Sequence, residues 1–445
     1  MKIISDKDIK VNSQDTSKKT SIDNNQKQII ITESSQIKDM FDRKNTNKTN
    51  YVTNIKIILI LLYFIIVIWT ETYYRDYLFQ KSISYQENIQ KNENNIIILK
   101  ISKIISIFGG EISTLFIFGI IFLFMPLNYS FLLLQAVVYS SYLTNTLKML
   151  YQSDRPNWHS DDLTFSCDYG YGNPSGHSIT CITLYLSLSH VFVNFFKIKG
   201  IVKIIIFIFF IFFSLLIITS RVILAAHSIN QVLYGFGLGL GLYFILIYCL
   251  GYHKYSSVDY LGHIGKKKVN YLYYILHIFL LISTILIYII IKPKDNSKIE
   301  ENIFNGLRCK IKNSYVKYEN DGLFQSLSIT SIIGAQLGLN ILFKILKNQN
   351  YMISVSIIEW NKTKEKKYIF LRIPIFLISS IGIILYYIIP KNSSLIIIFI
   401  FKSAVPFFLG MFGIHLVGIY ICIYFKIANK EIYKMDVLHE ITATA

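Results

Sequence analysis

The chain has 445 residues, of which 53% are hydrophobic and only 16% are charged, and its formal net charge is +18. A soluble globular protein carries about 25% charged residues, so this composition excludes an ordinary soluble protein. Positive charge is typical of the cytoplasmic loops of membrane proteins, and no motif of interleaved aromatic and basic residues is present, so nucleic-acid binding is not expected.

Apolar segments of about 18 or more residues recur along the chain, which is the length that a helix needs to cross a bilayer. They predict an all-α protein, a polytopic membrane helical bundle with about nine or ten transmembrane helices. The predicted spans lie near residues 54–70, 108–127, 130–150, 177–196, 201–220, 229–251, 271–291, 323–343, 369–389 and 394–425. The polar residues 1–50 predict a disordered cytosolic tail, and 85–107 predict an amphipathic helix at the membrane interface.

The positions of Lys and Arg in the short loops predict the orientation. Lysines gather in segments 197–203, 252–269 and 344–368. Because successive spans cross the membrane in opposite directions, these segments are predicted to lie on the same side as the N-terminal tail. This side is predicted to be the cytosol. The opposite side then holds the loops 71–95, 151–176, 221–228 and 292–322. Cys167 and Cys309 both fall there, where a disulfide or two free thiols are equally consistent with the sequence.

Three groups of polar residues lie where predicted spans meet the non-cytosolic side. They comprise Lys148 and Arg155, then Ser175, Gly176 and His177, then Arg221, His227 and Gln231. A single Lys or Arg at such a place is most often an interfacial anchor. Together, three cations and the N-terminus of a helix supply the donors that bind a phosphate dianion, and two histidines supply a nucleophile and a proton donor.

Two other patterns have simpler explanations. The alternating glycines of segment 235–241 lie inside a predicted span, where they favour close packing of helices over nucleotide binding. Asp161, Asp162 and Asp168 are interpreted as a solvated, charge-balancing loop, since no histidine spacing supports a metal site.

The three groups, in this order and spacing, resemble the signature of the type 2 phosphatidic acid phosphatase (PAP2) superfamily. The resemblance covers residues 51–251 and implies a six-helix PAP2-type catalytic core. It also implies metal-independent hydrolysis of a phosphomonoester, without a cofactor, through a phosphohistidine. His227 would be the nucleophile and His177 the proton donor. The phosphate would be bound by Lys148, Arg155, Ser175, Gly176 and Arg221.

Gln231 departs from much of the superfamily, which has Asp at this place. Its side-chain oxygen still accepts a hydrogen bond from an imidazole, but it supplies no negative charge, so weaker activation of the nucleophile is expected. The glucose-6-phosphatase branch is similar to this chain here, whereas Tyr171-Gly172 resembles the sphingosine-phosphate phosphatases. The substrate is therefore either a sugar phosphate such as glucose 6-phosphate or a lipid phosphate such as phosphatidate or sphingosine 1-phosphate.

The resemblance implies an integral membrane protein of the endoplasmic reticulum or another endomembrane, with its active site facing the lumen. The expected partners are the phosphorylated substrate and membrane lipids. Residues 252–445 form additional predicted transmembrane helices of unknown role. The alternative, motivated by Gln231, is a catalytically weak or inactive membrane binding or transport protein on the same fold.

Overall fold

The structure is a computed structural model. The residues that it describes are 55–110, 113–114, 116–117, 120–121, 127–160, 162–163, 165–166, 171–249 and 267–291. The chain divides into two compact units, Met1–Leu61 and Leu62–Ala445, and the contacts described below all lie in the second. The described part contains helices and no strand, so the all-α prediction is confirmed.

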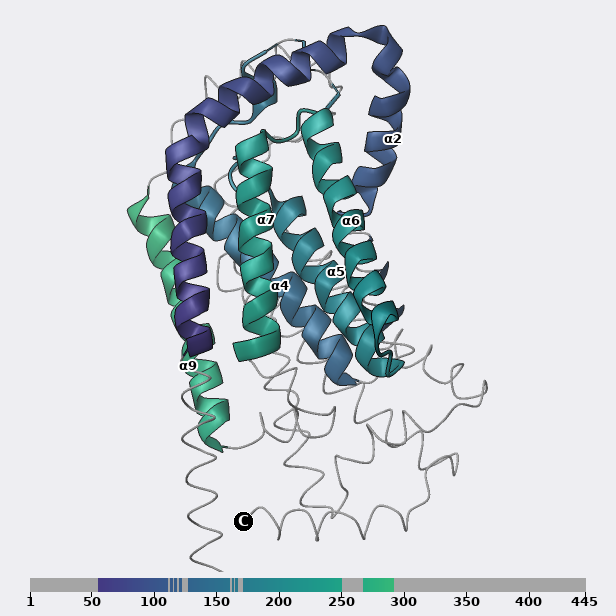
Figure 1. Ribbon diagram of the computed structural model, residues 1–445. Coiled ribbons are helices and arrows are strands. Elements are labelled where there is room, and N and C mark those ends of the chain that lie inside the picture. Colours follow the sequence, from purple (N-terminus) through teal and green to yellow (C-terminus); the bar gives the residue numbers. More distant parts are fainter. Residues whose placement is uncertain are drawn as a thin grey trace, which may run out of the picture. The chain divides into compact units, whose positions relative to one another are not determined.

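Four helices form the bundle that carries the predicted signature. They are α4 (Leu127–Tyr151), α5 (Gly176–Phe195), α6 (Ile201–Ile223) and α7 (Ile229–Phe244) (Figure 1). Helix α5 is central, since it packs against each of the other three. It begins at Gly176 because the Ser175 hydroxyl oxygen accepts the Ser178 N–H at 3.4 Å and caps the helix. After Phe244, α7 continues as a π-helical turn, Ile245–Cys249.

The alternating glycines of α7 allow two close helix contacts on different faces. A Cβ atom at Gly235 would lie 2.7 Å from the Ser175 carbonyl oxygen at the start of α5. On the other face, a Cβ atom at Gly237 would lie 2.9 Å from Val67 of the preceding long helix. Contacts this short leave no room for a side chain, so α7 lies directly against both neighbours. The predicted packing role of these glycines is confirmed.

That preceding helix runs from Ile55 to Lys91, well beyond the predicted span 54–70. From residue 62 onward it passes beside α7 and continues to the end of the bundle that carries the loop between α6 and α7 (Figure 1). The prediction that residues 71–95 form a loop was wrong. Several polar side chains of this segment are buried, with Ser82 and Gln86 fully enclosed, so tertiary packing stabilises its helical structure.

The chain then turns through a short 3-10 helix, η1 (Glu93–Asn95), into α2 (Ile96–Ile107). Helix α2 packs against α6, burying Leu99, Ser102 and Ser106, while all of its isoleucines except Ile105 are exposed. The single amphipathic helix predicted for 85–107 is therefore divided between the end of the first helix, η1 and α2, and in α2 the serines face the bundle while Lys100 and Lys103 are exposed.

Four described helices are long and apolar enough to cross a membrane: Ile55–Lys91, Gly176–Phe195, Ile201–Ile223 and Ile229–Tyr248. This agrees with a polytopic helical bundle. Helix α4 forms where a span was predicted, but its Ser, Thr and Asn residues make it less apolar, and much of it is buried among its neighbours. The predicted spans after residue 291 lie outside the described residues, so the total of about nine or ten stays a prediction.

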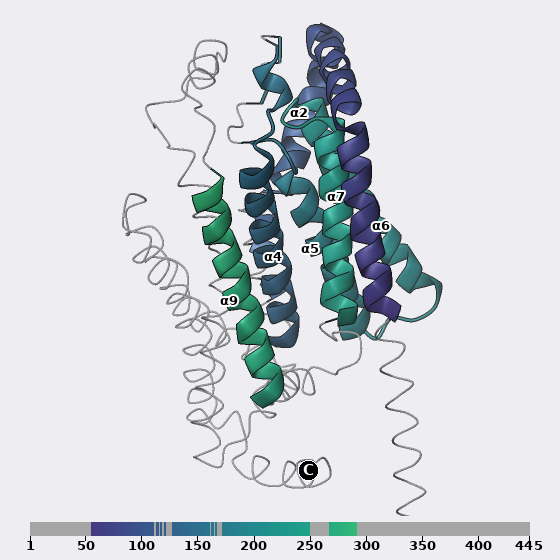
Figure 2. The same cartoon turned by 90° about the vertical axis from the view of Figure 1, so that its left-hand side faces the viewer.

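Helix α9 (Lys267–Ile290) lies along α4 (Figure 2). Two side-chain hydrogen bonds join these helices, from the Tyr139 hydroxyl to His277 Nε2 and from the Tyr142 hydroxyl to the Ser283 hydroxyl, each at 2.8 Å. His277 is fully buried. At least this part of segment 252–445 therefore packs directly on a helix of the bundle that carries the signature.

Candidate active site

Hydrogen bonds join the three predicted polar groups at one end of the bundle. Arg155, in the loop after α4, donates through Nη1 to the Ala226 carbonyl in the turn between α6 and α7 at 2.7 Å. The Ser175 N–H, at the start of α5, donates to the Gln231 carbonyl in the first turn of α7 at 3.1 Å. The expectation that the three groups meet is therefore confirmed.

His227 lies in the turn between α6 and α7 and is 2% exposed. The backbone N–H groups of Ala226 and His227 donate to the Arg221 carbonyl at 3.1 and 3.3 Å, which closes the end of α6. From the opposite side, the Gln86 amide nitrogen donates to the His227 carbonyl at 2.8 Å and to the Val222 carbonyl at 3.0 Å. The backbone of His227 is thus fixed by α6 and by the first helix together.

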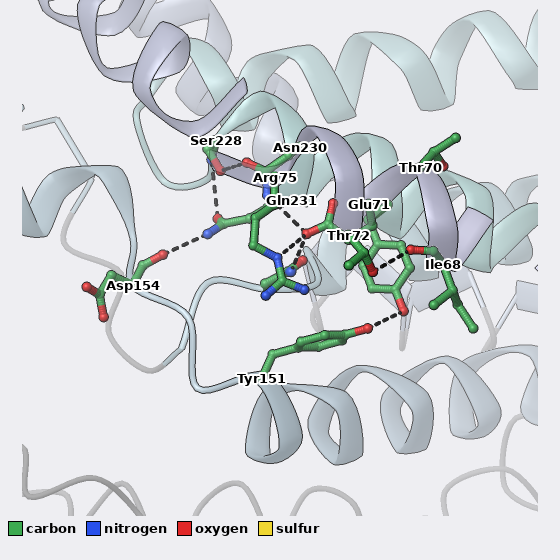
Figure 3. Close-up of polar contacts among 12 residues, drawn as sticks. Ile68, Thr70, Glu71, Thr72, Arg75, Tyr151, Asp154, Ser228, Asn230 and Gln231 are labelled. Carbon is green, nitrogen blue, oxygen red and sulfur yellow. Dashed lines mark hydrogen bonds and ion pairs between the residues drawn. The ribbon is translucent and has the colours of Figure 1, made fainter. Parts of the chain in front are cut away.

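The side-chain amide of Gln231 determines which imidazole nitrogen of His227 carries the proton. Its nitrogen donates to the Asp154 carbonyl at 2.7 Å, and its oxygen accepts the Ser228 N–H at 3.2 Å (Figure 3). Both partners have a single possible role, so the amide has one orientation. Because the same oxygen lies 3.2 Å from His227 Nδ1, Nδ1 must be the protonated nitrogen. The lone pair is therefore on Nε2.

Positive charge lies beside that lone pair. Arg155 Nη1 lies 3.4 Å from His227 Nε2. Burial, and then the charges of Arg155, Arg221, Lys148 and His177, hold the pKa of His227 well below its usual range. The imidazole is therefore neutral at neutral pH, which is the form that can act as a nucleophile.

Arg221 belongs to the last turn of α6 and is 7% exposed. Its Nη1 atom donates to the Ser106 hydroxyl of α2 at 2.7 Å. Helix α2 thus orients a guanidinium whose charge reaches His227.

His177 lies in the first turn of α5, and its ring lies against Gly109 just after α2. A Cβ atom at Gly109 would come within 2.9 Å of His177 Cδ2, so a glycine is needed for the ring to lie there. Gly176 contacts α4 in the same way, since a Cβ atom there would lie 2.9 Å from Thr144 Cγ2. The N-terminus of α5 is thus set closely between α4 and the segment after α2.

Comparison with known families gives one match over this part of the chain. Residues 129–255 match the family model of the PAP2 superfamily. The matched segment begins within α4 and extends beyond the π-helical turn Ile245–Cys249. It includes every predicted catalytic and phosphate-binding residue. No curated protein and no solved structure matches the chain. The predicted superfamily is therefore supported over this segment, which we call the PAP2 region, while the branch stays a prediction.

The predicted catalytic core, residues 51–251, included the first helix, which lies outside the PAP2 region, but sequence reasoning missed the polar contacts that this helix makes. Glu71 contacts Asn173 and Asn230, whereas Ser82 and Gln86 hold the turn between α6 and α7. A signal was present, since residues 71, 75, 78, 82 and 86 recur at the spacing of one helical face, and all but Leu78 are polar. The apolar stretch before them ended the predicted span too early.

Proposed function

We propose that the PAP2 region hydrolyses a phosphomonoester through a phosphohistidine formed on His227. The observation that carries this proposal is the state of the His227 imidazole, which is neutral, buried and held through Nδ1 by Gln231, with Nε2 beside Arg155. A fixed neutral imidazole beside a cation that can bind phosphate is suited to attack phosphorus.

In the first proposed step, the Nε2 lone pair of His227 attacks phosphorus and the bond from phosphorus to the ester oxygen breaks. Protonated His177 gives its proton to the departing oxygen, so an alcohol leaves. In the second step, water attacks the phosphohistidine and transfers a proton to His177. The phosphorus–nitrogen bond breaks, its electron pair returns to His227, and inorganic phosphate is released.

Phosphate binding is assigned to the cations and to the start of α5. Lys148, Arg155 and Arg221 contribute positive charge that already acts on His227 in the absence of substrate. Ser175 and Gly176 begin α5, whose N-terminus carries the positive end of the helix dipole. Preorganised charge of this kind stabilises the equatorial oxygens of a pentacoordinate transition state.

The test is phosphate release by the full-length, detergent-solubilised protein without divalent metal. Glucose 6-phosphate, phosphatidate and sphingosine 1-phosphate are offered side by side, with His227→Ala as the inactive variant. His190→Ala is the matched control, because His190 lies on α5 roughly 20 Å along the helix from His177 and should leave turnover intact. Cleavage of one ester that depends on His227 would support the proposal and identify the substrate class. Turnover by His227→Ala would refute the mechanism.

The alternative is a catalytically weak or inactive membrane binding or transport protein. It was motivated by Gln231, which stands where much of the superfamily has Asp. The contacts of Gln231 with Asp154, Ser228 and His227 argue against a degraded position, since both ends of its amide are used. Orthovanadate separates the two functions, because it mimics pentacoordinate phosphorus and should inhibit an enzyme at low concentration.

We also propose that the site faces the lumen of the endoplasmic reticulum or another endomembrane. The lysine distribution of the loops supports this orientation. In sealed microsomes, hydrolysis of glucose 6-phosphate or of a short-chain lipid phosphate should then require permeabilisation, and full activity in intact vesicles would contradict the lumenal placement.

A further inference from the structure

Glu71 is a buried carboxylate in the first helix, outside the PAP2 region. Glu71 is 5% exposed, and one of its carboxylate oxygens, Oε1, accepts three hydrogen bonds. The donors are Asn173 Nδ2 at 2.7 Å, Arg75 Nε at 3.1 Å and Asn230 Nδ2 at 3.2 Å. Figure 3 shows Glu71 between Arg75 and Asn230. A carboxylate buried to this extent is costly unless it is paired and hydrogen-bonded, and Glu71 is both.

The two asparagines belong to the two segments that carry the histidines. Asn173 is fully buried and lies four residues before His177, at the entry to α5. Asn230 lies three residues after His227, next to Gln231. A single oxygen of Glu71 therefore connects the His177 segment to the His227 segment.

The connection to His227 continues beyond Asn230. Because Glu71 can only accept, it fixes the Asn230 amide with its nitrogen toward the carboxylate. The Asn230 oxygen is then available for the Ser228 hydroxyl, which donates to it at 2.6 Å. Ser228 directly follows His227, and its N–H is the donor that orients the Gln231 amide.

Arg75 balances the charge of Glu71 and extends the cluster to α4. Its guanidinium lies over the Tyr151 ring, 4.7 Å from the ring centroid. The Tyr151 hydroxyl lies 3.1 Å from the Tyr234 hydroxyl of α7. The last turn of α4, from which the Arg155 loop departs, is thus tied to the same cluster.

We propose that Glu71 is a positioning residue that sets the relative placement of His177 and His227 through Asn173 and Asn230. This inference rests on the proposed function, because that placement matters only where the two histidines act on one phosphoryl group. It assigns the first helix a positioning role in the active site.

The test exchanges the charge between two contacting positions. Asn230→Asp alone places two carboxylates against each other, so we expect vanadate affinity and kcat to fall by about 10-fold or more. In the double variant Glu71→Gln with Asn230→Asp, the new amide donates to the new carboxylate, which still accepts from Ser228. The same amide nitrogen cannot accept from Asn173 and Arg75, which donate to Oε1 of Glu71, so we expect the double variant to recover only part of the loss caused by Asn230→Asp.

Glu71→Ala removes all three hydrogen bonds and should lower vanadate affinity and kcat by about 10- to 100-fold, with a smaller change in KM. Glu87→Gln is the matched control, because Glu87 is on the same helix and only approaches Lys91, at 3.9 Å. It should leave both quantities unchanged. Size-exclusion profiles and Tm values identify folded samples, and all comparisons are made at the same interval below each Tm.

The outcomes separate this inference from the proposed function. Equal vanadate affinities of Asn230→Asp and the double variant would overturn the role of Glu71, whether or not the wild type is active. Wild-type protein that binds vanadate with the expected coupling but cleaves no ester would support the role of Glu71 and remove the proposed hydrolysis. Wild-type protein that neither binds vanadate nor cleaves an ester would overturn both.

Discussion

Replacing Gln231 by Glu changes one group in the centre of the site. The side chain keeps its length and shape, but the amide NH₂ becomes a carboxylate oxygen. In the structure that NH₂ group donates to the Asp154 carbonyl at 2.7 Å, and Gln231 is fully buried. The variant therefore places a charged acceptor against a second acceptor, while the Ser228 N–H and the His227 Nδ1–H retain an oxygen partner.

The two changes act in opposite directions on the free energy of unfolding. The lost donor leaves the partly buried Asp154 carbonyl without this bond, which costs about 1–3 kcal/mol, and repulsion between the two oxygens adds to it. Charge-assisted bonds from Ser228 and His227 to the carboxylate stabilise the variant by about 1 kcal/mol. Desolvation of the buried carboxylate opposes this gain. We expect a net loss of about 2 kcal/mol and a Tm lower by several degrees. We also expect kcat to fall about 10-fold or more, because the carboxylate, repelled by the Asp154 carbonyl, shifts away from His227.

The assay combines thermal unfolding with phosphate release by the full-length protein in detergent. Gln90→Glu is the matched control, since the Gln90 amide donates to the Ile223 carbonyl at 3.4 Å in a partly exposed position. It should change Tm and kcat little. A Gln231→Glu variant as stable as wild type, and equally or more active, would refute the argument, because the donor to Asp154 would then be dispensable. The same reasoning predicts that Gln231→Asp, shorter and without a donor, does not improve catalysis.

Three further outcomes are expected. Burial holds the pKa of His227 low in the folded protein, so below about pH 6.5 the unfolded chain binds a proton at this position that the folded protein does not. The free energy of unfolding should therefore fall by up to about 1.4 kcal/mol per pH unit. In a measurement of Tm between pH 7.5 and 5, His227→Gln should flatten the part of the profile below pH 6.5. Gly172→Ala would set a methyl group against the Gln231 amide and 2.7 Å from the Asp154 carbonyl; kcat should fall about 10-fold or more, and an unchanged kcat would contradict the contact. Tyr139→Phe removes a buried bond to His277 and should cost about 1–2 kcal/mol by thermal unfolding; the loss should vanish in a His277→Phe background, and a full additional loss there would exclude the coupling.

The sequence alone was sufficient for the class of fold, and it predicted which polar segments come together at one end of the bundle. Long apolar segments specify helices in a bilayer without reference to any distant residue, because length and hydrophobicity are local properties. Alternation of the spans then brought Arg155, Ser175 and His227 to one end of the bundle, as the hydrogen bonds between their segments confirm. The glycine pattern of α7 likewise predicted close packing, since only a residue without Cβ permits it.

Tertiary structure decided what each of those residues contacts. The amide orientation of Gln231, and with it the protonated nitrogen of His227, depends on the Asp154 carbonyl, which lies 77 positions away in the chain. The continuation of the first helix to Lys91 could not be predicted from hydropathy, because Glu71, Ser82 and Gln86 are as polar as loop residues. They are helical because buried partners on the PAP2 region accept or donate their hydrogen bonds, and such partners exist only once the helices have packed.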